Sequence, residues 1–241
     1  MDFKIMTTSE LISYIKNFNW SRKVKQLHIH HTWKPDHSYY NGTNGIALQT
    51  AMYKYHVNLN RWRDIAQHLT LLPDGQWVTG RSFNTDPASI QGWNDGAFCI
   101  EMLGNFDKGF DTLQGRQAEA MFEFCAFFVV HMKIDIRSSV KFHRDNPAVG
   151  KTCPGSGLDR EWFMGQLYEK IKTLCLPIKD EEDWKLKAVD ELASAGILKD
   201  PQSWKEKINE PMPVWAVLAI SNEIYQKLSE RIESKNHNHT D

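Results

Sequence analysis

Residues 24–32 read Val-Lys-Gln-Leu-His-Ile-His-His-Thr, an apolar strand that ends in two adjacent histidines. Side chains alternate across a strand, so Leu27 and Ile29 point to one face while the histidine between them and His30 point to the other. We take His30 as the last strand residue, with His31 facing away. The stretch therefore predicts a core strand that carries imidazoles to its carboxyl end.

Another histidine, His143, closes a second short apolar run, residues 140–143 (Val-Lys-Phe-His). The turn-rich residues 144–150 follow it. Such a turn can bring Cys153 back toward His143. With His30, these residues offer two imidazole nitrogens and a thiolate, a donor set that selects Zn²⁺ over oxygen-seeking cations. Three protein ligands leave one position for a water, as in catalytic zinc sites. A lone strand histidine is more often a satisfied core or surface residue, so the prediction depends on all three donors.

A third strand is expected at residues 97–103 (Ala-Phe-Cys-Ile-Glu-Met-Leu), and it contains a glutamate. Glutamate is depleted in strands, and a buried unpaired carboxylate is costly. Alternation puts Glu101 on the same face as the small residues Ala97 and Cys99, which leaves room for a metal-bound water and a substrate. The functional interpretation is a general base. The alternative is a strand-end glutamate paired with an arginine.

Taken together, these segments resemble the zinc N-acetylmuramoyl-L-alanine amidases, the family shared by phage endolysins, bacterial autolysins and peptidoglycan recognition proteins. The resemblance runs from about residue 20 to residue 175. The segments that carry it are Ile29-His30-His31-Thr32, Ile100-Glu101-Met102-Leu103-Gly104, His143 with Lys151-Thr152-Cys153-Pro154-Gly155, and the strand 65–71 with its hairpin Pro73-Asp74-Gly75 and Val78-Thr79-Gly80-Arg81.

The resemblance implies that His30, His143 and Cys153 bind Zn²⁺. It also implies that Glu101 activates a water and that Lys151 lies near the developing oxyanion. The implied activity is hydrolysis of the amide bond between N-acetylmuramic acid and L-alanine of the stem peptide. Bacterial peptidoglycan is then the expected partner.

Two departures from the family pattern concern the site. Many relatives have a tyrosine just before the histidine matched to His68, whereas this chain has Gln67, so no tyrosine role can be carried over. The interval from His143 to Cys153 is slightly longer than in most relatives, which leaves the loop conformation open. The candidate substrate contacts are His68, Gln67, Trp93 and Trp33, although a solvated surface is the more frequent place for such loop residues.

Helices alternate with strands along the chain, which predicts an α/β fold with a mixed β-sheet flanked by helices, as in the amidases and peptidoglycan recognition proteins. Helices are expected at residues 8–17, 45–56, 113–132 and 159–175. Strands are expected at residues 24–30, 65–71, 76–79, 97–103 and 140–143.

A proline and an acidic run at residues 177–183 divide the chain of 241 residues. We expect a zinc amidase domain at residues 1–177 and a small all-α C-terminal domain at residues 178–241. The second segment is similar to S-layer homology modules, which bind cell-wall polymers. The alternative is a helical appendage that packs on the catalytic domain or forms a homodimer. Its last helix carries an apolar stripe of Val214, Val217, Leu218, Tyr225, Leu228 and Ile232.

The formal net charge is −1, which argues against nonspecific nucleic-acid binding by a basic surface. No segment is long and apolar enough to insert in a membrane. The N-terminus leads directly into a capped helix at residues 7–10 without an apolar signal core. We therefore expect a protein made in the cytoplasm without a signal peptide, which acts on the cell wall after release by host lysis or a holin.

Three rival functions belong to other classes. A noncatalytic peptidoglycan-binding protein shares the fold, but such receptors typically lose the third ligand, and Cys153 is present. A Cys-His amidase would use Cys153 as its nucleophile, which leaves Glu101 and His30 without a role. Some phage amidases also bind a polymerase as regulators.

Overall fold

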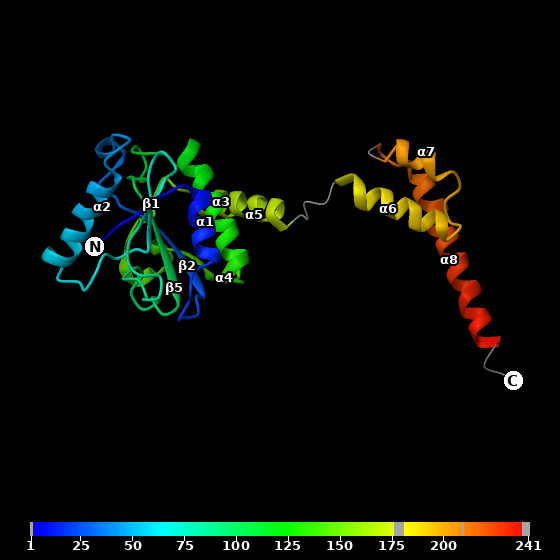
Figure 1. Cartoon of the computed structure of the whole chain (residues 1–241), viewed down its shortest axis with the longest axis horizontal. Helices are drawn as coiled ribbons and strands as arrows, with labels where there is room; N and C mark the ends of the chain where they lie inside the picture. Colours follow the sequence, from blue (N-terminus) through cyan, green and yellow to red (C-terminus); the bar gives the residue numbers. More distant parts are fainter. Residues whose placement is uncertain (1, 176–180, 209, 238–241) are drawn as a thin grey trace. The chain divides into compact units, whose positions relative to one another are not determined.

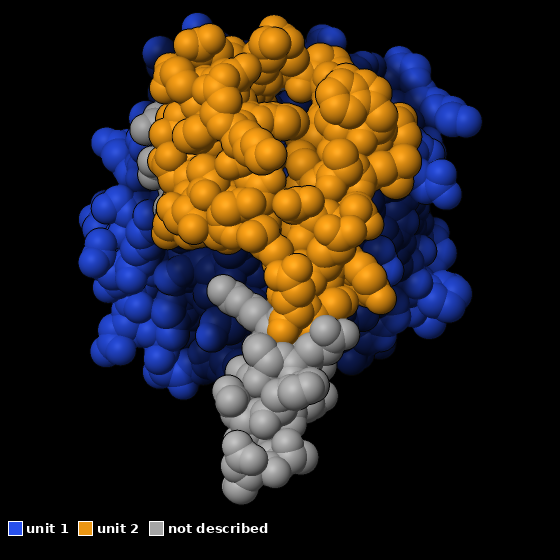
Figure 2. All heavy atoms as spheres, turned by 90° about the vertical axis from the view of Figure 1, so that its right-hand side faces the viewer, with its two compact units in different colours: residues 1–176 blue, residues 177–241 orange. Residues whose placement is uncertain are grey.

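A computed structural model gives the fold of residues 2–175, 181–208 and 210–237, and the side chains of residues 175, 181–184 and 231–237 are not described. The chain divides into two compact units, residues 1–176 and 177–241, which are coloured separately in Figure 2. The start of the expected domain boundary lies outside the described residues. So does the side chain of Ile232, which we expected in the apolar stripe of the last helix.

A β-sheet forms the centre of the first unit (Figure 1). It has six strands in the order β1-β4-β3-β5-β2-β6. Strands β3, β5, β2 and β6 are parallel, whereas β4 runs against its neighbours β3 and β1. This arrangement confirms the predicted mixed sheet. The strands are β1 Ile5–Met6, β2 Gln26–His31, β3 Leu69–Leu71, β4 Trp77–Thr79, β5 Ala97–Met102 and β6 Val140–Phe142.

Helices cover both faces of this sheet (Figure 1). They are α1 Thr8–Lys16, α2 Gly45–Lys54, α3 Gly115–His131, the short α4 Ile136–Ser139 and α5 Arg160–Cys175. Alternate strand residues such as Ile29 and Phe98 join Phe124 and Phe128 of α3 in the larger apolar cluster. Burial of each such side chain contributes about 1.5–3 kcal/mol. The other face, under α2, has a smaller apolar cluster with Met52 and leaves room for polar side chains.

The strands differ in extent from the sequence prediction, most of all at residues 65–71, and β2 ends at His31 and not at His30. The strand expected at residues 65–71 contains only Leu69–Leu71, because side chains bond the backbone before it. Arg81 donates to the Ile65 carbonyl at 2.7 Å, and the Ala66 N–H donates to Nδ1 of His56 at 3.2 Å. The strand expected to close with residue 143 ends at 142, where the short helix η3 (His143–Asp145) begins.

The second unit contains three helices in its described residues: α6 Glu181–Ser194, α7 Pro201–Glu206 and α8 Val214–His237. Gly196, with φ +67°, follows the end of α6. Val189, Leu198 and Ala216 are buried within the unit. Within the described part of the chain, no helix combines the length and the apolar character needed to cross a membrane.

Candidate metal centre and active site

The site lies where three parallel strands end. His30 of β2 pairs in register with Glu101 of β5, and Ile29 pairs with Phe142 of β6. His143, the next residue after β6, therefore comes beside His30. Because register partners point to the same face of a sheet, His30 and Glu101 project together from its carboxyl edge, where open α/β sheets bind their ligands.

The structure brings the three predicted donors together. The ligand atoms of His30, His143 and Cys153 all lie within 4.8 Å of one another. Nδ1 of His30 is 3.4 Å from Sγ of Cys153, and the two imidazole centroids are 4.7 Å apart. Bonds of about 2.1 Å to nitrogen and 2.3 Å to sulfur at a tetrahedral angle separate the two atoms by about 3.6 Å. The donor set and its spacing therefore fit Zn²⁺.

A hydrogen-bonded loop holds Cys153 against the strand ends. The longer interval after His143 is taken up by η3 and by a second short helix, η4 (Pro147–Val149). The Arg144 N–H donates to the Cys153 carbonyl at 2.8 Å, and its guanidinium donates to the Leu158 carbonyl at 2.6 Å. The His31 N–H donates to Sγ of Cys153 at 3.4 Å. These bonds position the sulfur before any ion binds.

Burial sets the protonation states of the donors. It lowers the pKa of His30 well below its ordinary value, and burial together with the charge of Lys151 lowers the pKa of His143. Both imidazoles are therefore neutral, as metal binding requires. Burial raises the pKa of Cys153 to about 12, although the His31 N–H opposes this shift. A thiol of this kind ionises beside a cation but is a poor free nucleophile, which argues against the Cys-His amidase alternative.

Glu101 is an unpaired carboxyl beside the donors. Burial raises its pKa to about 8, and no charge or hydrogen bond from the described residues offsets the shift. None of the ion pairs among the described residues includes Glu101, so the alternative of an arginine-paired glutamate does not apply. A carboxyl that has no ion-pair partner among the described residues can accept a proton from a nearby water, as the general-base interpretation requires.

A cavity of about 420 Å³ opens over these residues. The three donors, Glu101 and Lys151 line it, and two of the candidate substrate contacts, Trp33 and Gln67, also do. Trp33 is 55% exposed and has a φ of +58°, an uncommon conformation for a residue with a Cβ. The cavity is therefore bounded by polar groups at its base and by an exposed indole at its rim.

The other two candidate contacts lie elsewhere. His68 is 0% exposed; its Nδ1 accepts from the Cys99 N–H at 2.9 Å and its Nε2 donates to the Thr85 carbonyl at 2.8 Å. With both ring nitrogens bonded, it has no group left for a substrate. Trp93 is not in the cavity wall. Nζ of Lys141 lies over its indole ring, 5.2 Å from the ring centroid. Neither residue therefore lines the cavity that contains the donors.

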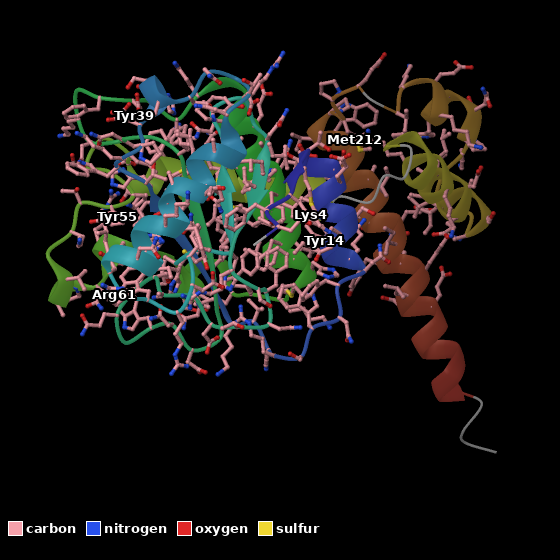
Figure 3. The ribbon with its side chains drawn as sticks, turned by 60° about the vertical axis from the view of Figure 1, so that its left-hand side comes forward. Lys4, Tyr14, Tyr39, Tyr55, Arg61 and Met212 are labelled. Carbon is pink, nitrogen blue, oxygen red and sulfur yellow. The ribbon has the colours of Figure 1, made fainter. Side chains whose placement is uncertain are left out.

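One wall of the cavity was missed by the sequence analysis. His56 and Trp62 stack with their ring centroids 4.8 Å apart, and both line the cavity. His56 belongs to η2 (Tyr55–Leu59), a π-helical turn that continues α2; in Figure 3 the label Tyr55 marks this junction. Because Nδ1 of His56 accepts from the Ala66 N–H, its neutral ring carries the proton on Nε2. An irregular turn has no sequence period, so only the histidine and tryptophan themselves were visible signals.

Comparison with known families decides the relationship. Residues 20–156 match the family model described as N-acetylmuramoyl-L-alanine amidase. The chain belongs to this amidase family. The resemblance read from the sequence is thereby confirmed, and the zinc-type donor set falls inside the matched residues.

Curated relatives of the amidase family align over short segments. A human N-acetylmuramoyl-L-alanine amidase is 28% identical over 86 residues, which cover 36% of this chain and 15% of the human protein. The mouse protein of the same name is 26% identical over 80 residues, which cover 33% of this chain and 15% of the mouse protein. The matched segment is thus a small part of either relative.

Solved structures show the same amidase-family fold. A Drosophila PGRP-LB mutant in complex with tracheal cytotoxin has a TM-score of 0.51 and 24% identity, covering 60% of this chain and 82% of that one. The N-acetylmuramoyl-L-alanine amidase LysC from Clostridium intestinale URNW has a TM-score of 0.50 and 22% identity, covering 63% and 94%. The fold therefore extends across peptidoglycan recognition proteins and bacterial amidases.

Proposed function

We propose that this chain is a zinc-dependent peptidoglycan hydrolase that cleaves the amide bond between N-acetylmuramic acid and L-alanine, of the endolysin or autolysin type. The observation that carries the proposal is the complete His30, His143 and Cys153 donor set beside the unpaired carboxyl of Glu101 in one cavity. A noncatalytic receptor of this fold typically lacks the third ligand, which is present here as Cys153.

Each residue of the site has a chemical role in this proposal. When bound, Zn²⁺ supplies a Lewis acid that acidifies a water and polarises the scissile carbonyl. Glu101 takes a proton from the attacking water and returns it to the departing alanine nitrogen. Lys151, exposed at the cavity, offsets negative charge on the carbonyl oxygen.

The partner in this proposal is bacterial peptidoglycan. The Drosophila structure with tracheal cytotoxin supports it, because a protein of this fold holds a ligand of that kind. Access to the wall would follow release from the cytoplasm by lysis or a holin. The cavity is also large enough for part of a muramoyl peptide and carries an exposed indole, Trp33, for a sugar face.

Digestion of purified cell walls tests the reaction. The zinc-loaded protein is expected to release fragments with new alanine amino termini and no new reducing sugar ends, as measured by mass spectrometry. New reducing ends would indicate a glycosidase, and amino termini on other residues a peptidase. Full activity after a strong chelator has removed all metal would contradict the zinc mechanism.

A shortened protein tests the second unit, for which we propose a wall-targeting role. All proposed ligands and catalytic residues precede residue 154, and residues 1–176 form a compact unit of their own. A protein that ends near residue 176 should keep its zinc and cleave a soluble muropeptide. It should sediment less with intact walls and lyse them more slowly than the full chain. Insoluble protein or a changed oligomeric state would favour the structural alternative.

A further inference from the structure

Gln67 occupies an unusual place in the cavity wall. Its side chain is 0% exposed, and it lines the same cavity as the donors and Glu101. Its amide nitrogen donates to Oγ1 of Thr70 at 2.8 Å. Thr70 of β3 is the register partner of Glu101 on β5, so both side chains point to the same face of the sheet. The Gln67 amide is therefore held on the face that carries the site.

A chain of hydrogen bonds fixes which way this amide points. Nε2 of Gln49, from α2, donates to the Thr79 carbonyl at 3.0 Å, so Oε1 of Gln49 must be the atom that faces Thr70. The Thr70 hydroxyl then donates its only proton to that Oε1, at 2.7 Å. The Thr70 hydroxyl can therefore only accept a hydrogen bond from Gln67. Nε2 of Gln67 must be the atom that donates it, so Oε1 of Gln67 points away from Thr70.

The consequence is a free acceptor in the wall of the site. Oε1 of Gln67 is buried and has no hydrogen-bond partner among the described residues. An unsatisfied buried carbonyl is unfavourable in the free protein, and it favours any ligand that supplies an N–H or O–H. The acceptor is also shielded from bulk water, so a hydrogen bond made there is worth more than one at the surface.

We propose that Oε1 of Gln67 accepts a hydrogen bond from a peptide N–H of the bound muramoyl peptide, which makes Gln67 a specificity-determining residue. Thr70 and Gln49 are positioning residues that act through it. This inference rests on the proposed function. Many relatives have a tyrosine here, whose hydroxyl can donate to an oxyanion. The locked amide presents only an acceptor, so its role is recognition of an N–H group.

Binding to a protein that cannot turn over tests the inference. The Glu101→Gln variant, loaded with zinc, is titrated calorimetrically with N-acetylmuramoyl-L-alanyl-D-isoglutamine. Adding Gln67→Met, which keeps the length of the side chain but removes the acceptor, should weaken binding by about tenfold, the scale of one hydrogen bond. The melting temperature should change little, because the substitution removes the unsatisfied Oε1 together with the hydrogen bond from Nε2 to Thr70. Unchanged binding would overturn the role of Gln67.

A matched pair at Thr70 tests the orientation of the amide. Thr70→Val, which removes the hydroxyl that holds Nε2 of Gln67, should weaken binding by roughly threefold because the amide is free to rotate. Thr70→Ser keeps the hydroxyl and should bind the peptide like the Glu101→Gln protein, which is the parent of all these variants. Equal binding by the valine and serine variants would overturn the positioning role.

An analogue with an N-methylated L-alanine identifies the donor. The parent should bind it about tenfold more weakly than the natural peptide, and the Gln67→Met protein should bind both peptides alike. Discrimination that persists in Gln67→Met would overturn the proposed contact while leaving the amidase function standing. Failure of every variant, parent included, to bind the natural peptide would overturn the proposed function and this inference with it.

Discussion

His30 in β2 and His68 just before β3 are two buried histidines of the same sheet, yet their surroundings differ in one respect. Burial lowers the pKa of both, that of His68 to about 3, so neither carries a charge at neutral pH. His68 bonds through both ring nitrogens and stacks on Phe98 with centroids 4.5 Å apart. Nε2 of His30 has no partner among the described residues, and its Nδ1 faces the sulfur of Cys153.

The difference teaches which buried histidine serves the fold and which serves a ligand. A buried polar group is stable when its partners are protein atoms, as at His68. Nδ1 of His30 faces the sulfur of Cys153, and a cation that displaces the thiol proton can be bound by both atoms. Burial and pKa direction are common to the two residues, so hydrogen-bond satisfaction is the property that separates them.

The largest effect is expected at the donor cluster. Cys153→Ser should reduce zinc from about one ion per chain to a small fraction and abolish wall lysis, because a hydroxyl is a poor substitute for a thiolate ligand. Metal analysis and a turbidity assay measure the two effects. Cys125→Ser, in the core of α3, is the matched control and should retain zinc. Normal zinc content in Cys153→Ser would contradict the assignment of His30 and Cys153 to a metal site.

A smaller loss of activity is expected when the metal stays. Glu101→Gln should keep about one zinc per chain and a normal fold, and it should lose about a hundredfold or more in rate, the scale of a lost general base. The exposed Glu119→Gln is the control and should leave the rate unchanged. Near-normal turnover by the Glu101 variant would assign the proton transfer to another group.

The histidine in the core should affect stability and not metal content. His68→Leu leaves the Cys99 N–H and the Thr85 carbonyl without their partner, which should lower the free energy of unfolding by about 2–4 kcal/mol. Urea unfolding and zinc analysis are the measurements. His131→Leu, at an exposed histidine, should change stability by less than about 0.5 kcal/mol. Loss of zinc together with unchanged stability in His68→Leu would reverse the two assignments.

The smallest effect is the pH dependence from His68. Its folded pKa of about 3 lies below its ordinary value of 6.5, so the unfolded chain binds more protons between these values. The contribution of neutral His68 to the free energy of unfolding is fully present above pH 6.5 and decreases as the pH falls toward 3. The free energy of unfolding of the metal-free protein should therefore fall more steeply from pH 6.5 to 4.5 than that of His68→Leu. Parallel curves would show that His68 is not buried in neutral form.

The resemblance already implied much of the site. Apolar alternation around His30 and Glu101 gave the strands and the face that carries the donors, since a strand encodes its faces in its local period. Residue chemistry indicated zinc, because imidazole and thiolate donors leave few other choices. Both signals are local, and the structure brings the three donors within 4.8 Å of one another.

Tertiary structure decided which polar residues are satisfied. The carbonyl that accepts from His68 belongs to Thr85. The series of hydrogen bonds that orients Gln67 starts at Gln49, 18 positions earlier in the sequence. The wall formed by His56 and Trp62 depends on an irregular turn. No sequence period records such contacts, because the partners of a buried hydrogen bond are set by how distant segments pack and not by their order along the chain.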